Sequence, residues 1–252
     1  METLFIGRNI IFLPQVNSTN SYAIELLKNV NLVEGTVVHT ADQTNGRGQR
    51  GSVWSTEKTS NLTASLIIKP TFLELKYQHY LYQIAALACY DVLAELLDTS
   101  QFDIKIKWPN DILVNNKKIA GILIENNISK TQISWSVIGV GLNINQTIFD
   151  ESINAVSLKT LTDKTFEIEM ILKLFCENFE KYYLQLKNNK LTQIKTEYLK
   201  HFFRINNWMD FEINNSTHTL LVKGSSDRGL LLLENKSGKQ LEFDVKEIKW
   251  IV

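Results

Sequence analysis

The sequence predicts an α+β fold, in which helices pack on a β-sheet in one large domain and a small β-barrel follows. Three observations support this fold class. The chain has 252 residues, enough for one large domain and a small one. Short β-rich segments and long helical patterns fill the chain as far as residue 205. After Trp208, short strands alternate with turns. We therefore expect one domain over residues 1–205 and another over residues 206–252.

The first elements follow from the spacing of apolar residues. Ser18 or Thr19 is a suitable N-cap for a helix whose periodic run begins at Tyr22. A second, longer helix is expected where apolar residues recur on one face. The elements expected here are strands over 10–16, 35–40 and 62–68, and helices over 22–27 and 76–97.

The middle and C-terminal parts of the chain carry a strand-rich region, two helices and a second strand-rich region. Asn115 and Asn116 mark the turn of a hairpin in the first of these regions. The expected strands cover 104–108, 112–114, 119–125, 133–144, 219–223, 229–234, 240–245 and 248–252, and the helices cover 167–186 and 192–203.

Charge and composition argue against several classes of protein. Lys plus Arg is 27 and Asp plus Glu is 27, so the basic excess of a typical DNA-binding protein is absent. No apolar run is long enough to span a membrane, and the first residues lack the features of a signal peptide. Cys89 and Cys176 are expected to be buried free thiols of a cytoplasmic protein.

A glycine- and arginine-rich segment over residues 43–54 is the first candidate for a functional site. Glycines permit close approach of the backbone to a ligand. Arginines offer fork-shaped donors for phosphate or carboxylate. The segment is neither a Walker A loop nor a Rossmann fingerprint, because the residues that follow do not fit. Taken alone, such a segment is more often a flexible surface turn.

A second candidate segment covers residues 107–125 and contains Lys-Trp-Pro-Asn-Asp. Asn110 and Asp111 stand at the start of a strand, where they could hold a magnesium-bound phosphate or cap a turn. Lys118 follows the hairpin turn, where a lysine is either an exposed residue that guards a strand edge or a cation directed at an anion.

The third candidate segment, residues 139–145, places small residues near a strand end. Such residues again allow a ligand to approach the backbone. The side chain of Asn143 in this segment could hydrogen-bond a purine or a ribose, or it could be an ordinary turn residue.

Together these segments resemble the catalytic domain of biotin–protein ligases, a family that also includes the biotin operon repressors. The resemblance rests on motifs in the family's order and spacing. They are Ser-Thr-Asn at 18–20, the glycine-rich motif at 46–54, Lys-Trp-Pro-Asn-Asp at 107–111, Lys-x-Ala-Gly-Ile-Leu-x-Glu at 118–125, Gly-x-Gly-x-Asn at 139–143 and Asp-x-x-Gly-x-Leu-Leu-Leu-Glu at 227–234. The resemblance implies a mixed sheet like that of class II aminoacyl-tRNA synthetases, an SH3-like terminal barrel, and ATP, biotin and Mg²⁺ as reactants and cofactor.

The resemblance also implies a reaction and roles for residues. Biotin and ATP give biotinyl-5′-AMP, from which the biotinyl group passes to a lysine of a biotin carboxyl carrier protein. Lys118, Arg47 and Arg50 are the implied catalytic residues, with Lys118 between the biotin carboxylate and the α-phosphate. The implied biotin-binding residues are Ser18, Thr19, Asn20, Gln43, Arg47, Gly48, Gln49, Lys118 and Gly121.

The nucleotide end of the implied site involves a further group of residues. The glycine-rich loop is expected to order over bound ligand as a lid. Asp111 is the implied magnesium ligand. The residues implied for ATP or adenylate are Gly46, Arg50, Gly51, Trp54, Asn110, Asp111 and Asn143.

The sequence also departs from the family pattern. Gln49 replaces an arginine of the loop, and Ser52 and Val53 occupy positions that are often basic, which bears on how tightly the adenylate is retained. The first motif begins at Ser18, so we expect no DNA-binding domain and no repressor activity. A lipoate or octanoate ligase and a non-catalytic biotin sensor are the alternatives, and a homodimer is possible.

Overall fold

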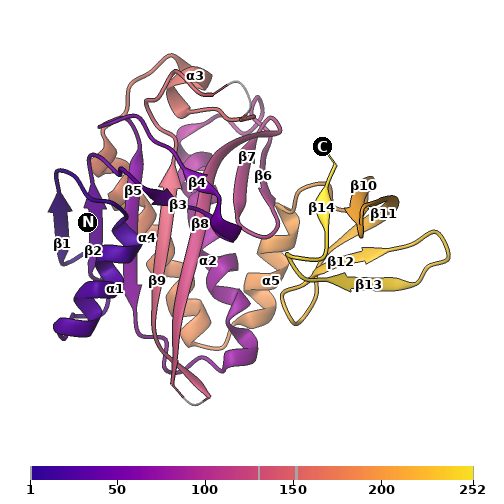
Figure 1. Cartoon of the computed structure of the whole chain (residues 1–252), viewed down its shortest axis with the longest axis horizontal. Coiled ribbons are helices and arrows are strands. Elements are labelled where there is room, and N and C mark those ends of the chain that lie inside the picture. Colours follow the sequence, from indigo (N-terminus) through magenta and orange to yellow (C-terminus); the bar gives the residue numbers. More distant parts are fainter. Residues whose placement is uncertain (1, 130, 151–152, 252) are drawn as a thin grey trace.

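The computed structural model describes residues 2–129, 131–150 and 153–251, and its largest element is a seven-stranded mixed sheet (Figure 1). Only β1 and β2 run parallel, and every other neighbouring pair is antiparallel. In spatial order the strands are β1 (Ile10–Leu13), β2 (Val37–Thr40), β5 (Leu62–Ile68), β9 (Gln132–Leu142), β8 (Lys117–Ser129), β7 (Asp111–Val114) and β6 (Ile104–Lys107).

The central strands are apolar on both sides because both faces of the sheet are covered. Every residue of β5 is buried. Leu66 and Ile68 join the main core, whereas Ile67, which points the other way, packs in a smaller cluster with Ala23 of the first helix. A strand buried on both faces reads as a continuous apolar run, which explains the composition of this segment.

Helices therefore occupy both faces of the sheet (Figure 1). The helix α1 (Thr19–Asn29) covers one face, and Ser18 caps its N-terminus as the sequence predicts. The opposite face carries α2 (His79–Leu96) and α4 (Ile168–Lys187), with α5 (Leu191–Lys200) packed on both. The short elements η2 (Leu75–Tyr77) and α3 (Leu158–Thr162) complete this part of the chain.

The C-terminal part forms a five-stranded antiparallel sheet beside α5 (Figure 1). Its core continues that of the large sheet, since Phe211, Val222 and Leu231 belong to the same buried cluster as Ile106. This confirms the expected C-terminal β unit. In spatial order its strands are β13 (Gln240–Phe243), β12 (Leu231–Glu234), β11 (Ser216–Ser225), β10 (Trp208–Ile213) and β14 (Lys249–Trp250).

Several boundaries differ from the sequence prediction for identifiable reasons. The first strand ends at Leu13 instead of residue 16, because Pro14 cannot donate to a strand ladder. The glycine-rich segment is a small hairpin of β3 (Gly46–Arg47) and β4 (Val53–Trp54) around the 3₁₀ turn η1 (Gln49–Gly51). Strands of two residues carry no periodic signal, so the sequence predicted a loop here.

Two further expectations concern burial. Cys89 and Cys176 are buried and free, as predicted, and burial raises the pKa of both thiols to about 12. No helix of the described ranges is both long and apolar enough to cross a membrane.

Candidate active site

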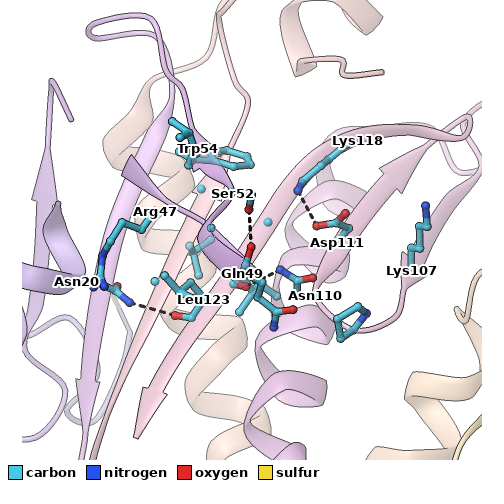
Figure 2. A pocket seen from close by; sticks show the side chains of 18 of the residues that line it. Asn20, Arg47, Gln49, Ser52, Trp54, Lys107, Asn110, Asp111, Lys118 and Leu123 are labelled. Carbon is cyan, nitrogen blue, oxygen red and sulfur yellow. Dashed lines mark hydrogen bonds and ion pairs between the residues drawn. The ribbon is translucent and has the colours of Figure 1, made fainter. Parts of the chain in front are cut away.

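A cavity of about 410 Å³ lies on the face of the sheet that carries α1, within the usual range for small-ligand sites. The hairpin β3–β4 and residues of the C-terminal sheet contribute to its walls. Figure 2 shows that side chains from the first two candidate segments converge there, and Gly139, Val140 and Gly141 of the third segment also line the cavity. Of the residues that the sequence implicated, those on the cavity wall are Ser18, Thr19, Asn20, Gln43, Arg47, Gly48, Gln49, Trp54, Asn110, Asp111, Lys118 and Gly121.

A network of hydroxyl and amide groups forms one end of the cavity. Gln43 Oε1 accepts hydrogen bonds from the backbone N–H of Thr19 at 2.9 Å and from its hydroxyl at 3.2 Å. Ser65 Oγ hydrogen-bonds Thr19 Oγ1 at 2.8 Å and Asn20 Oδ1 at 2.6 Å. Donors and acceptors are thus fixed at the N-terminus of α1, which suits a polar ring with both N–H and C=O groups.

The carboxylate of Glu125 connects this network to the guanidinium group of Arg47. Asn20 Nδ2 donates to Glu125 Oε2 at 2.9 Å, and Arg47 Nη2 lies 2.8 Å from the same oxygen. The side chains of Arg47 and Glu125 are 43% and 29% exposed. Ion pairs between such partly exposed groups are worth about 1 kcal/mol or less. An anionic group of a ligand can therefore replace Glu125 as the partner of Arg47 at little cost in free energy.

Trp54 lies flat on the sheet over a pair of glycines. Gly121 and Gly141 are opposite each other in the β8–β9 ladder. A Cβ atom on Gly141 would lie 2.2 Å from Trp54 Cε2, and one on Gly121 would lie 3.1 Å from Trp54 Cζ3. The glycines therefore provide the space that the indole occupies. Trp54 Nε1 is buried and has no hydrogen-bond partner among the described residues.

The second cation of the cavity is held by the hairpin of β7 and β8. Lys118 Nζ lies 2.7 Å from Asp111 Oδ1 and 5.5 Å from the centre of the Trp54 ring (Figure 2). Asn110 anchors the same hairpin, since its Nδ2 donates to the carbonyl of Ile122 at 2.9 Å. Lys118 is about one-third exposed. It therefore faces the cavity instead of guarding a strand edge.

The metal-binding potential of the site rests on Asp111. Among the described residues, no three His, Cys, Asp or Glu side chains cluster as metal ligands. Magnesium is commonly held by one or two carboxylates together with substrate phosphates and water. The single carboxylate of Asp111 fits an ion that arrives with a nucleotide better than a resident ion.

Four implicated residues are not placed on the cavity wall. Gly46 packs against the carbonyl of Trp54, and Gly51 has a φ of +78° in the turn of the loop. Asn143 is buried and donates to the carbonyl of Val156 at 3.1 Å, so it holds two backbone segments together. The backbone of Arg50 lies in η1, but its side chain lies outside the described part of the structure.

The cavity wall and the groups bonded to it also include residues that the sequence did not single out. Ser65 and Glu125 link the groups described above, and Glu125 ends a motif that was quoted without a role for it. Lys107, which opens another quoted motif, also lines the cavity. The C-terminal sheet contributes Lys249 and Trp250. No local pattern marks these last two residues, because they reach the site through tertiary packing.

The Ser52 position of the loop has a structural use. Its hydroxyl donates to the carbonyl of Gln49 at 2.7 Å, and the N–H of Gly48 donates to the carbonyl of Ser52 at 2.7 Å (Figure 2). The loop is therefore closed by its own hydrogen bonds, with Arg47 as its described cation at the cavity.

Comparison with known proteins agrees with this geometry. Residues 12–143 match the model of the biotin/lipoate A/B protein ligase family. The chain is 31% identical to the bifunctional ligase/repressor BirA of Bacillus spizizenii, over 94% of the chain and 73% of that protein. It is 27% identical to the biotin–[acetyl-CoA-carboxylase] ligase of Paracoccus denitrificans, over 91% and 95% of the two.

The solved structure of the Aquifex aeolicus biotin protein ligase in complex with biotin and ATP has the same fold. It superposes with a TM-score of 0.79 at 24% identity, covering 96% of this chain and 98% of that one. The chain therefore belongs to the biotin/lipoate A/B protein ligase family, and within it to the biotin–protein ligases.

Proposed function

We propose that the chain joins biotin to ATP to form biotinyl-5′-AMP and pyrophosphate, and then transfers the biotinyl group to a lysine of a carrier protein. The observation that carries this proposal is the pair of cations in one cavity. Lys118 and Arg47 each have a carboxylate partner, at 2.7 Å and 2.8 Å. The hydroxyl and amide network at the N-terminus of α1 lies beside them.

The chemistry requires such cations because both reactants are anionic. The carboxylate of biotin must attack an α-phosphate that also carries negative charge. Lys118 is placed to neutralise both groups when the ligand displaces Asp111, and Arg47 is placed to do so when it displaces Glu125. A magnesium ion bound with ATP would supply further charge neutralisation, and Asp111 is the residue that would hold it.

The ureido ring of biotin offers two N–H donors and one carbonyl acceptor. In this proposal it binds at the network of Ser18, Thr19, Asn20 and Gln43, in which Ser65 orients the side chains of Thr19 and Asn20. The loop with Gln49 and the indole of Trp54 cover the mixed anhydride and keep water from it.

Transfer to the carrier needs no nucleophile from the enzyme. The neutral amine of the acceptor lysine attacks the biotinyl carbonyl, and AMP leaves with the electron pair. Both cysteines are buried outside the cavity wall, so neither is placed to form an enzyme-bound intermediate. We propose a biotin carboxyl carrier protein as the acceptor. We assign the catalytic residues to 1–205 and the terminal β domain to 206–252.

The experiment that tests this function compares acids as substrates. Purified protein is incubated with ATP, Mg²⁺ and labelled biotin, lipoate or octanoate, and the acyl-adenylate is separated and counted. We expect biotinyl-5′-AMP and, once a carrier domain is added, label on one lysine. Adenylation of lipoate or octanoate alone would assign the chain to the other branch of the family. Tight biotin binding without adenylate would favour the sensor alternative.

Two further properties belong to this proposal. The zero net charge favours a ligase without repressor activity, and a gel shift with biotin operator DNA tests it. Self-association would use the edge strand β1, where Ile10 and Phe12 are 42% and 53% exposed. Sedimentation velocity with Phe12→Lys as the control variant tests that edge.

A further inference from the structure

The strand β8 loses its neighbour on one side halfway along its length. β7 pairs with β8 only as far as Gly121. Asn110 extends this pairing by one residue, because its carbonyl accepts from the N–H of Ile122 at 3.0 Å and its Nδ2 donates to the carbonyl of Ile122. From there to Ser129, β8 pairs only with β9 among the described residues. The backbone groups of Ile124 on the open side therefore need other partners.

Side chains of α2 take the place of the missing strand. The hydroxyl of Tyr82 accepts a hydrogen bond from the N–H of Ile124 at 3.3 Å and donates to the carbonyl of Ile124 at 3.4 Å. One helical turn earlier, Gln78 Oε1 accepts from Asn126 Nδ2 at 3.2 Å. Residues four apart share a helix face and residues two apart share a strand edge, so the two spacings match. The first turn of α2 is thus joined directly to β8.

This part of β8 lies at the biotin end of the cavity. The carbonyl of Leu123 accepts from Asn20 Nδ2 at 3.3 Å, as Figure 2 shows, and Glu125 Oε2 accepts from the same group at 2.9 Å. Leu123 and Glu125 flank Ile124, so their side chains point to the other face of the sheet. Tyr82 itself does not line the cavity. It forms a fixed point just behind the biotin end of the cavity wall.

The hydroxyl of Tyr82 also contacts the glycine-rich loop. Burial raises the pKa of this phenol, whereas hydrogen bonds with the backbone of Ile124 and the side chain of Gln49 lower it. The pKa remains above its usual value of about 10, so the phenol is protonated at neutral pH. Both bonds to Ile124 are longer than the usual distance of about 2.8–3.0 Å. A hydroxyl with one proton and two lone pairs therefore has capacity left for Gln49.

Gln49 is suited to this contact because its side chain carries no charge. Gln49 lines the cavity, and its backbone carbonyl is already bonded to Ser52 Oγ at 2.7 Å. Its side chain stands where the family resemblance implies an arginine. An arginine forms ion pairs with phosphate or carboxylate, whereas the amide of Gln49 pairs with an uncharged hydroxyl. The loop is thereby attached to α2 of the protein itself.

We propose that Tyr82 is a positioning residue whose hydroxyl holds the glycine-rich loop at Gln49 and thereby slows the release of biotinyl-5′-AMP. The inference rests on the proposed function and adds a residue from outside the sequence motifs and the cavity wall. Tyr82 acts through Gln49, and its bonds to Ile124 keep the anchoring hydroxyl in place. Retention of the adenylate then depends in part on a neutral hydrogen bond within the protein.

The competing explanation is that Tyr82 only joins α2 to β8 as part of the packing. A purely structural role would lower the free energy of unfolding and leave the kinetics of the folded protein unchanged. A positioning role changes the rate at which the adenylate dissociates, and this change depends on the presence of Gln49. The two explanations therefore differ in a kinetic measurement on folded protein.

The test is Tyr82→Phe, with Tyr182→Phe as the matched control. Tyr182 is a buried tyrosine of α4 that does not line the cavity, and its hydroxyl donates to Asp91 Oδ2 at 2.9 Å. Both variants keep the ring and lose a hydroxyl with its hydrogen bonds. Labelled biotinyl-5′-AMP is bound to each protein, and its dissociation is followed after addition of excess unlabelled adenylate.

For Tyr82→Phe we expect dissociation of the adenylate to be roughly three- to tenfold faster than in wild type, as for the loss of one neutral hydrogen bond. The control Tyr182→Phe should stay within about twofold of wild type. Thermal unfolding of both variants is recorded in parallel. An unchanged dissociation rate in Tyr82→Phe would overturn the inference.

Gln49→Leu completes a double-mutant cycle with Tyr82→Phe. If the two side chains act through their mutual bond, Tyr82→Phe should change the dissociation rate by less than about twofold in the Gln49→Leu background. If Gln49 contacts only the ligand, the full effect of Tyr82→Phe remains in that background, and the inference is wrong.

Hydrogen exchange in wild-type protein covers a Tyr82→Phe protein that fails to fold. Binding of biotinyl-5′-AMP should slow exchange of the Ile124 amide, which donates to the Tyr82 hydroxyl, together with exchange of the loop amides. Protection of the loop without any change at Ile124 would contradict the proposal.

The wild-type protein also separates this inference from the proposed function. A wild type that neither forms nor binds biotinyl-5′-AMP would refute the proposed function. A wild type that forms and retains the adenylate, with a Tyr82→Phe variant that retains it equally well, would refute only the role of Tyr82.

Discussion

Replacing Gly141 with alanine should separate the fit of the indole from the stability of the sheet. The added Cβ would lie 2.2 Å from Trp54 Cε2, whereas ordinary contacts begin at 3.4 Å. The indole must therefore retreat by about 1 Å, and overpacking of this kind costs about 1–3 kcal/mol. A displacement of about 1 Å at a reacting centre can cost about 100-fold in rate. We expect adenylate formation to fall by about that factor.

Gly121→Ala is the matched control, because Gly121 faces Gly141 across the ladder. Its Cβ would lie 3.1 Å from Trp54 Cζ3, so the ring needs to move by only a few tenths of an ångström. Its rate should fall no more than about threefold. Both rates are measured by single-turnover formation of biotinyl-5′-AMP, and thermal unfolding is recorded in parallel.

A double-mutant cycle tests whether the indole transmits the effect. In a Trp54→Leu background, Gly141→Ala meets no ring, so the two changes should couple by about 1–2 kcal/mol. The reasoning fails if both glycine variants lose activity equally, or if the effects of Gly141→Ala and Trp54→Leu simply add.

Three further predictions concern charge. Lys118→Met should slow adenylate formation by about 10²–10³-fold. It also removes a partly exposed ion pair, which should lower the free energy of unfolding by only about 1 kcal/mol. The control is Lys117→Met at the exposed neighbouring residue, which should keep wild-type kinetics. Glu125→Gln removes the negative charge that competes with the ligand for Arg47. Biotinyl-5′-AMP should therefore dissociate roughly two- to fivefold more slowly, as measured by stopped flow. Faster dissociation would contradict this reasoning. Burial lowers the pKa of His79 from 6.5 to about 4, so its neutral form stabilises the fold fully above pH 6.5 and this contribution is lost as the pH falls through about 4. In urea unfolding, His79→Gln should reduce the change in the free energy of unfolding between pH 6.5 and about 4 by about 2 kcal/mol, a figure that allows for the partial exposure of the side chain. An unchanged pH dependence would show that another group controls it.

The elements predicted best were those whose signal is local. Residues 62–68 form a strand with the predicted bounds because every side chain is apolar or small enough to be buried. Ser18 caps α1 because its short side chain reaches the N–H of Ser21. The β7–β8 hairpin turns at Asn115 and Asn116, both of which adopt the positive φ that such turns require.

The parts that could not be predicted depend on distant partners. Ser65 looks like one polar residue in a buried strand until α1 brings Thr19 and Asn20 to it. Trp250 enters the cavity only because the C-terminal sheet docks on β6 and α5. The ligand-binding role implied for Asn143 stays a prediction, since the structure shows its side chain buried and donating to the carbonyl of Val156.

The continuity of the core across the two sheets has a consequence for how the chain can be divided. Phe202 packs against Ile106 at the edge of the large sheet and belongs to the same buried cluster as Phe211 and Leu231. A fragment ending at residue 205 would leave the apolar side chains around Phe202 facing water. The terminal sheet is thus no detachable module. Both sheets should lose their protection from amide hydrogen exchange in one cooperative step. Substitutions in the core on one side of residue 205 have to remain compatible with the core residues on the other side.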